Sequence, residues 1–296
     1  MKNFIKIIII LIKCFLNKKD TIQDRDKEWR QAQLSKLSSY LQKLLHKLQN
    51  PPDCLKARKI VCNLNKGCGF GCQLHHVVYC TVVAIATERT LILNSKSWRY
   101  VSNSHKSKSL WEAAFLPLSN TCLDDFGVTR ASWGPESETA QVLHLPVIDS
   151  LHSRPDYLPL AIPEKLSRRL ILVHSAPSVW FIGQILKYLL RPTPEIDKFL
   201  QERSEMFGYK HPIVGVHVRR TDKIHSEASF HKLSEYMNYV EEFYNRLDIW
   251  NYRNGIKKID EKLVYLATDD IGVWKKEISN YKKLGFKFIG DDQICK

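Results

Sequence analysis

The chain has 296 residues and a formal net charge of +14, a size that suits one large or two small domains. Residues 1–60 contain fourteen Lys and Arg but five Asp and Glu, so most of the excess positive charge lies in the first fifth of the chain. The remainder is mildly basic and lacks the interleaved basic and aromatic residues of a nucleic-acid groove. A nucleic-acid partner is therefore not expected.

Residues 1–19 form an apolar and basic N-terminal segment. Phe4 to Leu16 are mostly Ile, Leu and Phe, and Lys6 and Lys13 interrupt them. A membrane-spanning helix needs roughly 20 apolar residues. This segment is therefore short for an anchor, although it has the character of a signal-type apolar region.

Residues 20–50 are predicted to form a helix, in which five leucines recur at spacings of three and four: Leu34, Leu37, Leu41, Leu44 and Leu48. Such a seam is typical of a coiled coil. It is also compatible with a helix that packs on the domain that follows, and this second interpretation is favoured for so short a stretch. Asn50-Pro51-Pro52-Asp53 ends the helix.

Residues 51–206 are expected to be a cysteine-rich α/β region. Val82 to Ala86 and Leu91 to Leu93 belong to its predicted core, and six of the eight cysteines fall between Cys54 and Cys122. A zinc cluster is one interpretation, with the candidate ligands Cys68, Cys72, His75, His76 and Cys80. Disulfides in an oxidising compartment are the other, and a paired set of cysteines suits them better.

Residues 207–296 contain the most informative stretch of the sequence. Ile213 to Val218 form a short apolar run of strand length, which predicts a buried strand of a parallel sheet. Arg219 and Arg220 follow it directly, at the end of the strand where ligands of such sheets bind. Because a guanidinium fits a phosphate bidentately, a diphosphate is the simplest partner for this cluster. The alternative is an ordinary solvated loop.

Two further strands are predicted, and polar residues follow each of them. Leu263 to Ala267 run into Thr268-Asp269-Asp270, and Phe286 to Ile289 run into Gly290-Asp291-Asp292. The segments between the three strands show apolar residues at helical spacing. This alternation predicts a doubly wound α/β layer with basic and acidic groups at one edge. Neither a Gly-rich dinucleotide fingerprint nor a P-loop follows any of these strands.

The motif His217-Val218-Arg219-Arg220-Thr221-Asp222-Lys223 resembles the donor-binding motif of the α-1,6-fucosyltransferases. Four other stretches look like the animal core fucosyltransferases of N-glycans: Val61 to Cys80 with its Gly67-Cys68-Gly69-Phe70-Gly71-Cys72, Arg89 to Leu93 with Trp98 to Tyr100, Asp149 to His152, and Tyr265 to Asp270. The resemblance runs from about Arg25 to about Asp291, and the order of several long motifs makes it specific.

The resemblance implies a GT-B-like α/β glycosyltransferase with a Rossmann-like donor-binding half. Family members transfer fucose from GDP-fucose to the 6-hydroxyl of the innermost GlcNAc of an N-glycan, invert the anomeric centre, and need no metal or other cofactor. They are type II membrane proteins of the Golgi with a lumenal catalytic domain. The implied partners are GDP-fucose, a glycoprotein N-glycan and, through the stem helix, a second copy of the chain.

The resemblance also assigns roles to residues. Arg219 is expected to hold the β-phosphate, His217 to contact the guanine and Tyr100 to lie against the nucleotide. Glu227 is expected to be the general base, coupled to Lys223; a helix-terminus charge is the alternative interpretation of Glu227. Asp269 and Asp270 are expected on the fucose and acceptor side, and the positions that shape the same pocket are Arg220, Asp222 and Tyr236.

The matching cysteines of the family form three disulfides. Carried over, these are Cys54–Cys122, Cys62–Cys80 and Cys68–Cys72, with the nearby histidines packed beside them and no metal bound. Cys14 and Cys295 have no assigned partner.

The sequence departs from the family in its length. Family members continue beyond the third predicted strand with the rest of the nucleotide-binding sheet and an SH3-like domain. We therefore expect the chain to be a fragment, an incomplete gene model or a degenerate copy with little activity of its own. The alternative function is an inactive fragment with at most weak donor binding or a scaffolding role. Phe70 also stands where the family is expected to have a tyrosine.

Overall fold

The computed structural model describes residues 26–96, 98, 100, 110–147, 153–155, 162–221, 224 and 229–292. The chain divides into two compact units, an N-terminal unit up to Asp197 and a C-terminal unit from Lys198. The division falls within helix α6 (Pro194–Phe207), whose last residue is also the first residue of the predicted donor-binding region. Within the described ranges, no helix combines the length and the apolar character needed to cross a membrane.

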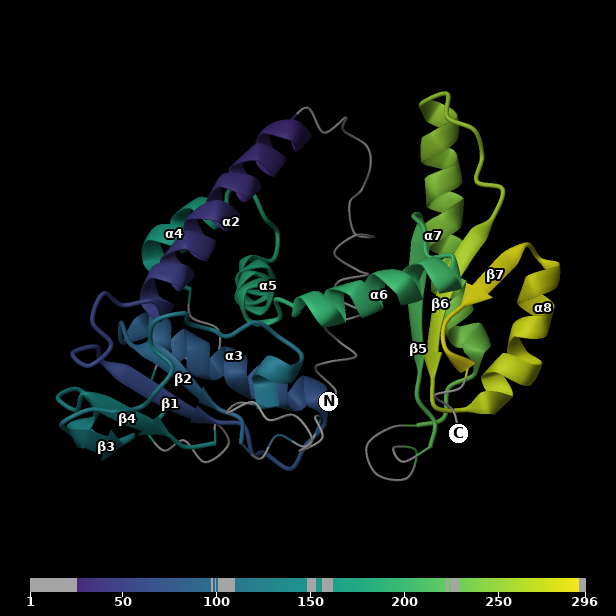
Figure 1. The fold of residues 1–296 in the computed structure, drawn as a ribbon. Coiled ribbons are helices and arrows are strands. Elements are labelled where there is room, and N and C mark those ends of the chain that lie inside the picture. Colours follow the sequence, from purple (N-terminus) through teal and green to yellow (C-terminus); the bar gives the residue numbers. More distant parts are fainter. Residues whose placement is uncertain are drawn as a thin grey trace. The chain divides into compact units, whose positions relative to one another are not determined.

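The N-terminal unit is built on a parallel sheet of four strands in the order β2-β1-β4-β3 (Figure 1). Its strands are β1 (Lys59–Asn63), β2 (Thr90–Asn94), β3 (Arg130–Ser132) and β4 (Val142–Leu145). Helix α3 (Phe70–Ala86) makes the crossover from β1 to β2, and its apolar residues pack against both. Two short 3₁₀ helices, η1 (Leu110–Ala113) and η2 (Pro135–Ser137), complete the connections.

Helix α2 (Lys27–Gln49) packs within its own unit, against α4 (Glu164–Leu170) and α5 (Pro177–Leu189). Leu37, Leu41 and Leu45 are buried at this contact. The hydroxyl of Ser38 and the amide of Gln42 donate to Gln184 of α5 at 2.7 and 2.8 Å. The leucine seam therefore packs within the chain, which is the interpretation favoured for so short a stretch. The buried residue is Leu45, whereas the predicted seam contained Leu44.

The structure contains the three disulfides that the resemblance implied. Cys54–Cys122 joins the segment before β1 to the segment after η1, and Cys62–Cys80 joins β1 to α3. Cys68–Cys72 spans the turn that begins α3. The N-terminal unit is thus fastened covalently along the strand and helix that carry the cysteine motif.

The C-terminal unit has a parallel sheet of three strands in the order β5-β6-β7. Its strands are β5 (Ile213–Val218), β6 (Lys262–Thr268) and β7 (Phe286–Ile289). Helix α7 (Leu233–Arg253) follows β5, and a π-helical turn η4 (Val273–Glu277) leads into α8 (Ile278–Lys283) after β6. The predicted α/β class with a Rossmann-like half is confirmed by these alternating strands and helices.

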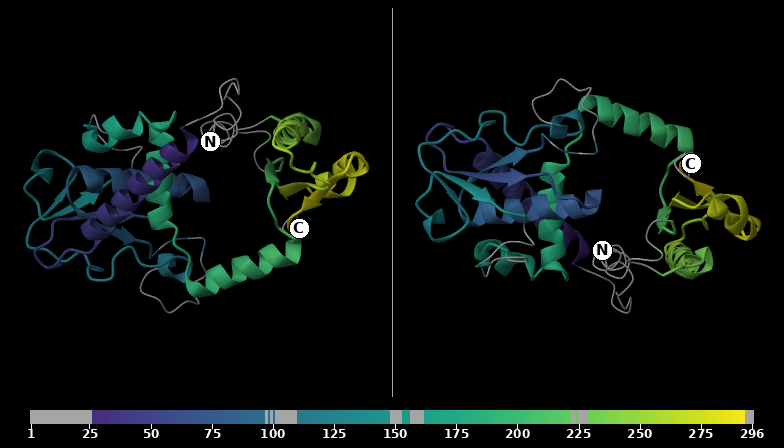
Figure 2. Two further views of the ribbon diagram at one scale, coloured as in Figure 1. Left: turned by 90° about the horizontal axis from the view of Figure 1, so that it is seen from above. Right: turned by 90° about the horizontal axis from the view of Figure 1, so that it is seen from below.

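The sequence prediction was wrong about how this sheet is covered. Both α7 and α8 lie on the same side of it (Figure 2), where Val216 and Val218 of β5 share one apolar cluster with Met237 of α7 and Ile278 of α8. The alternate residues Gly215 and His217 are exposed. In the described part of this unit, β5 is therefore a half-exposed strand rather than a strand buried on both faces of a doubly wound layer.

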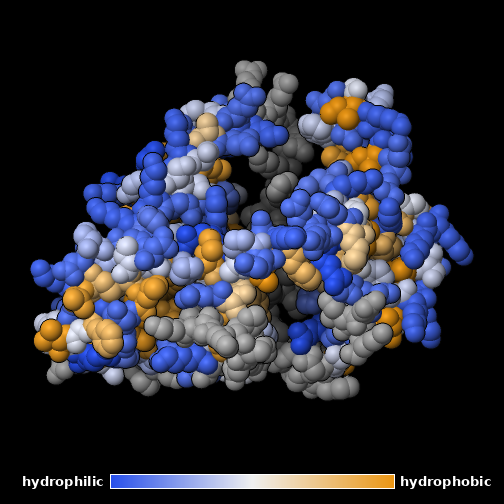
Figure 3. All heavy atoms as spheres, in the orientation of Figure 1, coloured by the Kyte–Doolittle hydropathy of each residue, from blue (hydrophilic) through white to orange (hydrophobic). Residues whose placement is uncertain are grey.

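On the face shown in Figure 3, the surface around α2 is mostly hydrophilic, and apolar residues gather near β3 and β4 and at the upper end of α7. Exposed apolar side chains of the N-terminal unit include Leu55, Leu123, Phe126 and Val128, which flank the Cys54–Cys122 disulfide in the sequence.

Candidate active site

A cavity of about 390 Å³ opens at the carboxyl ends of the C-terminal strands. It lies where the loops after parallel strands converge, the usual place for a ligand in such sheets. Its lining comes from the ends of β5 and β6 and from the residues that follow β7: His217, Arg219, Thr221, Tyr265, Leu266, Ala267, Thr268, Asp269 and Asp291.

The period of an extended chain decides which arginine reaches this cavity. Successive side chains point to opposite faces, and Val216 and Val218 face the helices. Arg220 follows them on the helix side, whereas Arg219 falls on the same side as His217 and lines the cavity. One of the two adjacent arginines therefore lines the cavity, and the other faces the helix side of the sheet.

Asp269 holds the turn that follows β5. Its carboxylate accepts the backbone amides of Arg220 and Thr221 at 2.8 and 3.2 Å and the hydroxyl of Thr221 at 2.6 Å. Arg219 Nε lies 3.8 Å from the same carboxylate. Burial opposes ionisation of Asp269, but the hydrogen bonds from Thr221 and from the amide of Arg220 outweigh it and keep the pKa of this carboxyl below its ordinary value.

Arg220 has all five guanidinium donors occupied. Its Nη1 contacts Asp270 at 3.1 Å and the Glu277 carboxylate, and its Nη2 donates to Glu277 at 3.0 Å. Nε and Nη2 donate to the carbonyl oxygen of His231 at 2.9 and 2.6 Å, and the ring of Phe230 lies 4.3 Å from the guanidinium carbon. With its side chain 4% exposed, Arg220 has no donor left for a ligand.

Arg220 and Glu277 each stabilise the charged form of the other. The hydrogen bonds from Arg220 lower the pKa of Glu277 despite the burial of this carboxyl. The same bonds to Glu277 raise the pKa of Arg220 against its own burial. Both groups are therefore charged at neutral pH.

His217 is accessible to solvent on the open face of β5, but the cavity that it lines partly desolvates its imidazole. This desolvation lowers the pKa of His217, the nearby charge of Arg219 lowers it further, and Asp269 opposes both in part. A neutral imidazole offers one donor and one acceptor, which suits contact with a polar heterocycle.

The structure brings together three of the predicted pocket residues, His217, Arg219 and Asp269. Asp270 turns away, since its carboxylate accepts the amide of Gly272 at 2.8 Å as well as Arg220. Tyr236 of α7 packs against the apolar cluster on the helix side, where burial raises the pKa of its hydroxyl. Arg220, Asp270 and Tyr236 thus surround the site from behind the sheet and do not line the cavity.

Four predicted residues need separate mention. Tyr100 belongs to the N-terminal unit, where its ring contacts Phe70 and Trp98 at centroid distances of 5.5 and 6.0 Å. Asp222, Lys223 and Glu227 lie outside the described residues, and their roles stay predictions.

Sequence reasoning gave no site role to two carboxylates. Asp291, which it placed at the same edge of the sheet, lines the cavity, because it follows β7 as Asp269 follows β6. Glu277 ends a helical turn among other charged residues. No pattern in the sequence distinguishes it from a solvent-facing glutamate.

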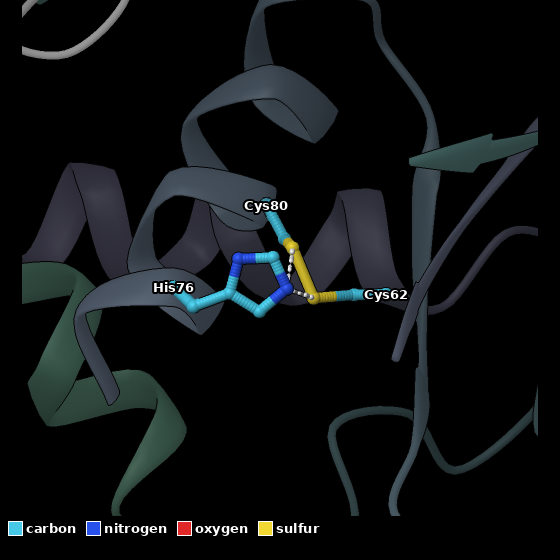
Figure 4. A group of neighbouring side chains, drawn as sticks. All are labelled: Cys62, His76 and Cys80. Atoms are coloured by element: carbon cyan, nitrogen blue, oxygen red, sulfur yellow. Dashed lines mark hydrogen bonds between the residues drawn. A yellow bond between two sulfur atoms is a disulfide. The ribbon is translucent and has the colours of Figure 1, made fainter. Parts of the chain in front are cut away.

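The cysteine motif does not form a thiolate metal site in this structure. Cys62, His76 and Cys80 bring potential ligand atoms together, but both sulfur atoms belong to one disulfide (Figure 4). His76 Nε2 lies 3.7 and 3.8 Å from these sulfurs. Cys68 and Cys72 are paired as well. Since metal binding needs deprotonated thiols, these paired cysteines cannot serve as the thiolate ligands of the alternative zinc interpretation.

Known proteins resemble this chain over nearly its whole length. The family model described as alpha-(1,6)-fucosyltransferase N- and catalytic domains matches residues 6–296. The alpha-(1,6)-fucosyltransferase of Drosophila melanogaster is 49% identical over 268 residues, which are 90% of this chain and 41% of that protein. The protein of the same name from Caenorhabditis elegans is 37% identical over 273 residues, 91% of this chain and 46% of that protein.

A solved structure of an Arabidopsis thaliana FUT1 mutant in complex with GDP is similar over 88% of this chain and 69% of that chain, with 12% identity and a TM-score of 0.47. This likeness is too distant to inform the site.

These matches define the class of the protein as glycosyltransferase, and more narrowly as fucosyltransferase. The chain belongs to the alpha-(1,6)-fucosyltransferase family. It spans less than half the length of the two relatives named above.

Proposed function

We propose that this chain carries the donor-binding and catalytic region of an inverting α-1,6-fucosyltransferase, which moves fucose from GDP-fucose to the 6-hydroxyl of the innermost GlcNAc of N-glycans. The observation that carries the proposal is the position of Arg219. It stands in a cavity at the carboxyl ends of three parallel strands, in a chain that belongs to this family.

The cavity suits a nucleoside diphosphate sugar. Arg219 supplies a cation and a rigid fork of donors for the β-phosphate, which gains negative charge as the bond to fucose breaks. Neutral His217 would contact the guanine. The ionised carboxylate of Asp269 faces the same space and would lie on the side of the fucose and its acceptor.

The proton of the acceptor hydroxyl must pass to a base as the new bond forms. We assign this role to Glu227, coupled to Lys223, with Asp222 in the same pocket and Tyr100 against the nucleotide. Arg220, Asp270 and Tyr236 contribute from behind the sheet by shaping the strand ends. In this proposal, Arg219 stabilises the leaving diphosphate directly, and no metal or other cofactor takes part.

The three disulfides support a location in an oxidising compartment. We therefore assign the chain to the Golgi lumen, where N-glycans on glycoproteins are its acceptors. A homodimer through the stem helix belongs to the same proposal, and the exposed side chains of Trp29 and Tyr40 on α2 are available for it.

Two assays on the disulfide-bonded 296-residue chain test this function separately. Isothermal titration with GDP measures donor binding. A transfer assay with GDP-fucose and a biantennary N-glycan that carries terminal GlcNAc measures chemistry, with EDTA present to remove metal ions. We expect GDP to bind and Arg219→Ala to weaken this binding about 100-fold. Failure of the wild-type chain to bind GDP would contradict the proposal, and transfer that stops in EDTA would contradict its metal-free mechanism.

A further inference from the structure

Glu277 lies outside the cavity but joins three segments that meet behind it. Its carboxylate accepts hydrogen bonds from both terminal nitrogens of Arg220 and from the backbone amide of Leu233 at 2.8 Å. Arg220 stands two residues beyond β5, Leu233 begins α7, and Glu277 ends η4. One side chain therefore fastens the turn after β5 to the two helical segments that follow in the chain.

Among the described residues, no other carboxylate that contacts Arg220 can replace the hydrogen bonds of Glu277. Asp270 reaches only Nη1 of Arg220, at 3.1 Å, and its second oxygen is engaged by the amide of Gly272. Without the carboxylate of Glu277, one donor on each terminal nitrogen of Arg220 and the amide of Leu233 would lose their partner. Unpaired donors on a buried guanidinium are costly, so Arg220 would be expected to leave this position.

Such a shift would act on the cavity through the neighbouring residues. Asp269 holds the backbone amides of Arg220 and Thr221, and Glu277 holds the side chain of Arg220 from the other face of the sheet. Fixing Arg220 toward the helices is what leaves Arg219 on the cavity side, because adjacent side chains of an extended chain point in opposite directions.

We propose that Glu277 is a positioning residue of the donor site, which acts through Arg220 to present Arg219 in a preformed geometry for the diphosphate. This inference rests on the proposed function, since the diphosphate is the ligand proposed there for Arg219. Removing a contact that orients a ligand-binding side chain typically lowers affinity or activity by about tenfold or more.

The test compares Glu277→Gln with Glu242→Gln in the 296-residue, disulfide-bonded chain. Glu242 is a matched control, because it also forms a short ion pair with an arginine, Arg246 at 2.6 Å, but on the exposed face of α7. Hydrogen exchange without ligand reports the turn itself, and titration with GDP reports its effect on binding. Arg220→Gln and the double variant with Glu277→Gln complete a thermodynamic cycle.

We expect Glu277→Gln to speed exchange in peptides covering Val218 to Thr221 and the start of α7, while peptides of β6 stay protected. GDP binding should weaken about tenfold, Glu242→Gln should match the wild type, and the double variant should bind no more weakly than Arg220→Gln alone. Unchanged exchange in the turn would overturn the inference, whether or not GDP binds. Faster exchange throughout the C-terminal unit would also overturn it, because it would indicate a general loss of stability. A double variant whose loss of GDP-binding free energy equals the sum of the two single losses would overturn it as well.

If the wild-type chain fails to bind GDP, the proposed function fails by itself. The exchange comparison still decides whether Glu277 fixes the turn.

Discussion

Both units of the chain contain a parallel sheet and a fully or nearly buried arginine, yet they hold these features by different means. In the N-terminal unit, Arg89 donates to the backbone carbonyls of Lys59, Ser137 and Gln141, and burial lowers its pKa. In the C-terminal unit, Arg220 donates to the carboxylates of Asp270 and Glu277, and its pKa is raised.

The two units also differ in how their segments are tied together. Three disulfides fasten the first unit, whereas residues 198–292 of the second contain no cysteine. The stability of the N-terminal unit should therefore respond to reduction of its disulfides, and that of the C-terminal unit to protonation of its carboxylates. The proposed donor site lies in the unit whose geometry depends on charge.

The largest expected effect comes from removing a disulfide of the N-terminal unit. Cys54–Cys122 closes a loop of 68 residues, so Cys54→Ser with Cys122→Ser should lower the free energy of unfolding of the N-terminal unit by about 4 kcal/mol. Native-state hydrogen exchange resolved by peptide measures each unit separately. Exchange in β5 and β6 should not change, and an equal loss of protection in both units would contradict the division.

A second test removes the cation of the proposed donor site. Arg219→Ala should weaken GDP binding about 100-fold, and Arg219→Lys should not restore it, because an ammonium lacks the planar fork. Titration calorimetry measures both variants. The control is Arg246→Lys, since Arg246 pairs with Glu242 on the exposed face of α7. Near-normal binding by Arg219→Lys would show that the fork is not used.

Acid should separate the two units. The carboxyls of Asp269 and Glu277 have lowered pKa values in the folded chain, so their stabilising contribution is present above the ordinary carboxyl pKa of about 4 and is lost as the pH falls below it. Pepsin, which cleaves in acid, should therefore cut within residues 198–292 before it cuts the disulfide-bonded unit as the pH is lowered from 5 to 2. Earlier cleavage in the N-terminal unit would contradict the expectation that the C-terminal unit is the more acid-sensitive of the two.

The smallest expected effects come from one glycine in each unit. Gly290 has φ +146°, and a Cβ there would lie 2.4 Å from the carbonyl oxygen of Leu266. Gly290→Ala should thus destabilise the C-terminal unit by about 1–3 kcal/mol. Gly183 lies inside α5 with nothing near its Cβ position, so Gly183→Ala should stabilise the N-terminal unit by about 0.5–1 kcal/mol. Peptide-resolved hydrogen exchange should show lower protection of the C-terminal unit in Gly290→Ala and higher protection of the N-terminal unit in Gly183→Ala. A stabilising Gly290→Ala would refute the steric argument.

Much of the C-terminal fold could be predicted from local sequence. The apolar runs that became β5 and β7 are bounded by charged residues and glycines, and both strands have the predicted bounds. Covering of the sheet could not be predicted in this way, because an apolar composition does not reveal whether helices lie on one face or on two. The same gap left the direction of the Arg220 side chain open. Its direction depends on which face of β5 the helices occupy.

The remaining features depend on contacts that are distant in sequence. Spacing alone left the cysteines open between zinc and disulfides, and only the resemblance selected the pairs that the structure contains. Glu277 meets Arg220 across 57 residues of sequence, at the end of a helical turn with no distinctive pattern. Such a contact becomes visible only when β5, α7 and η4 are assembled.

A crystal structure of the chain with GDP bound would test the roles of the two arginines most directly. We expect the β-phosphate to accept hydrogen bonds from the guanidinium of Arg219, while Arg220 remains bound to Glu277 and Asp270 behind the sheet. A structure in which Arg220 leaves Glu277 to bind the diphosphate, with Arg219 in solvent, would contradict the assignment of the two arginines and the positioning role of Glu277.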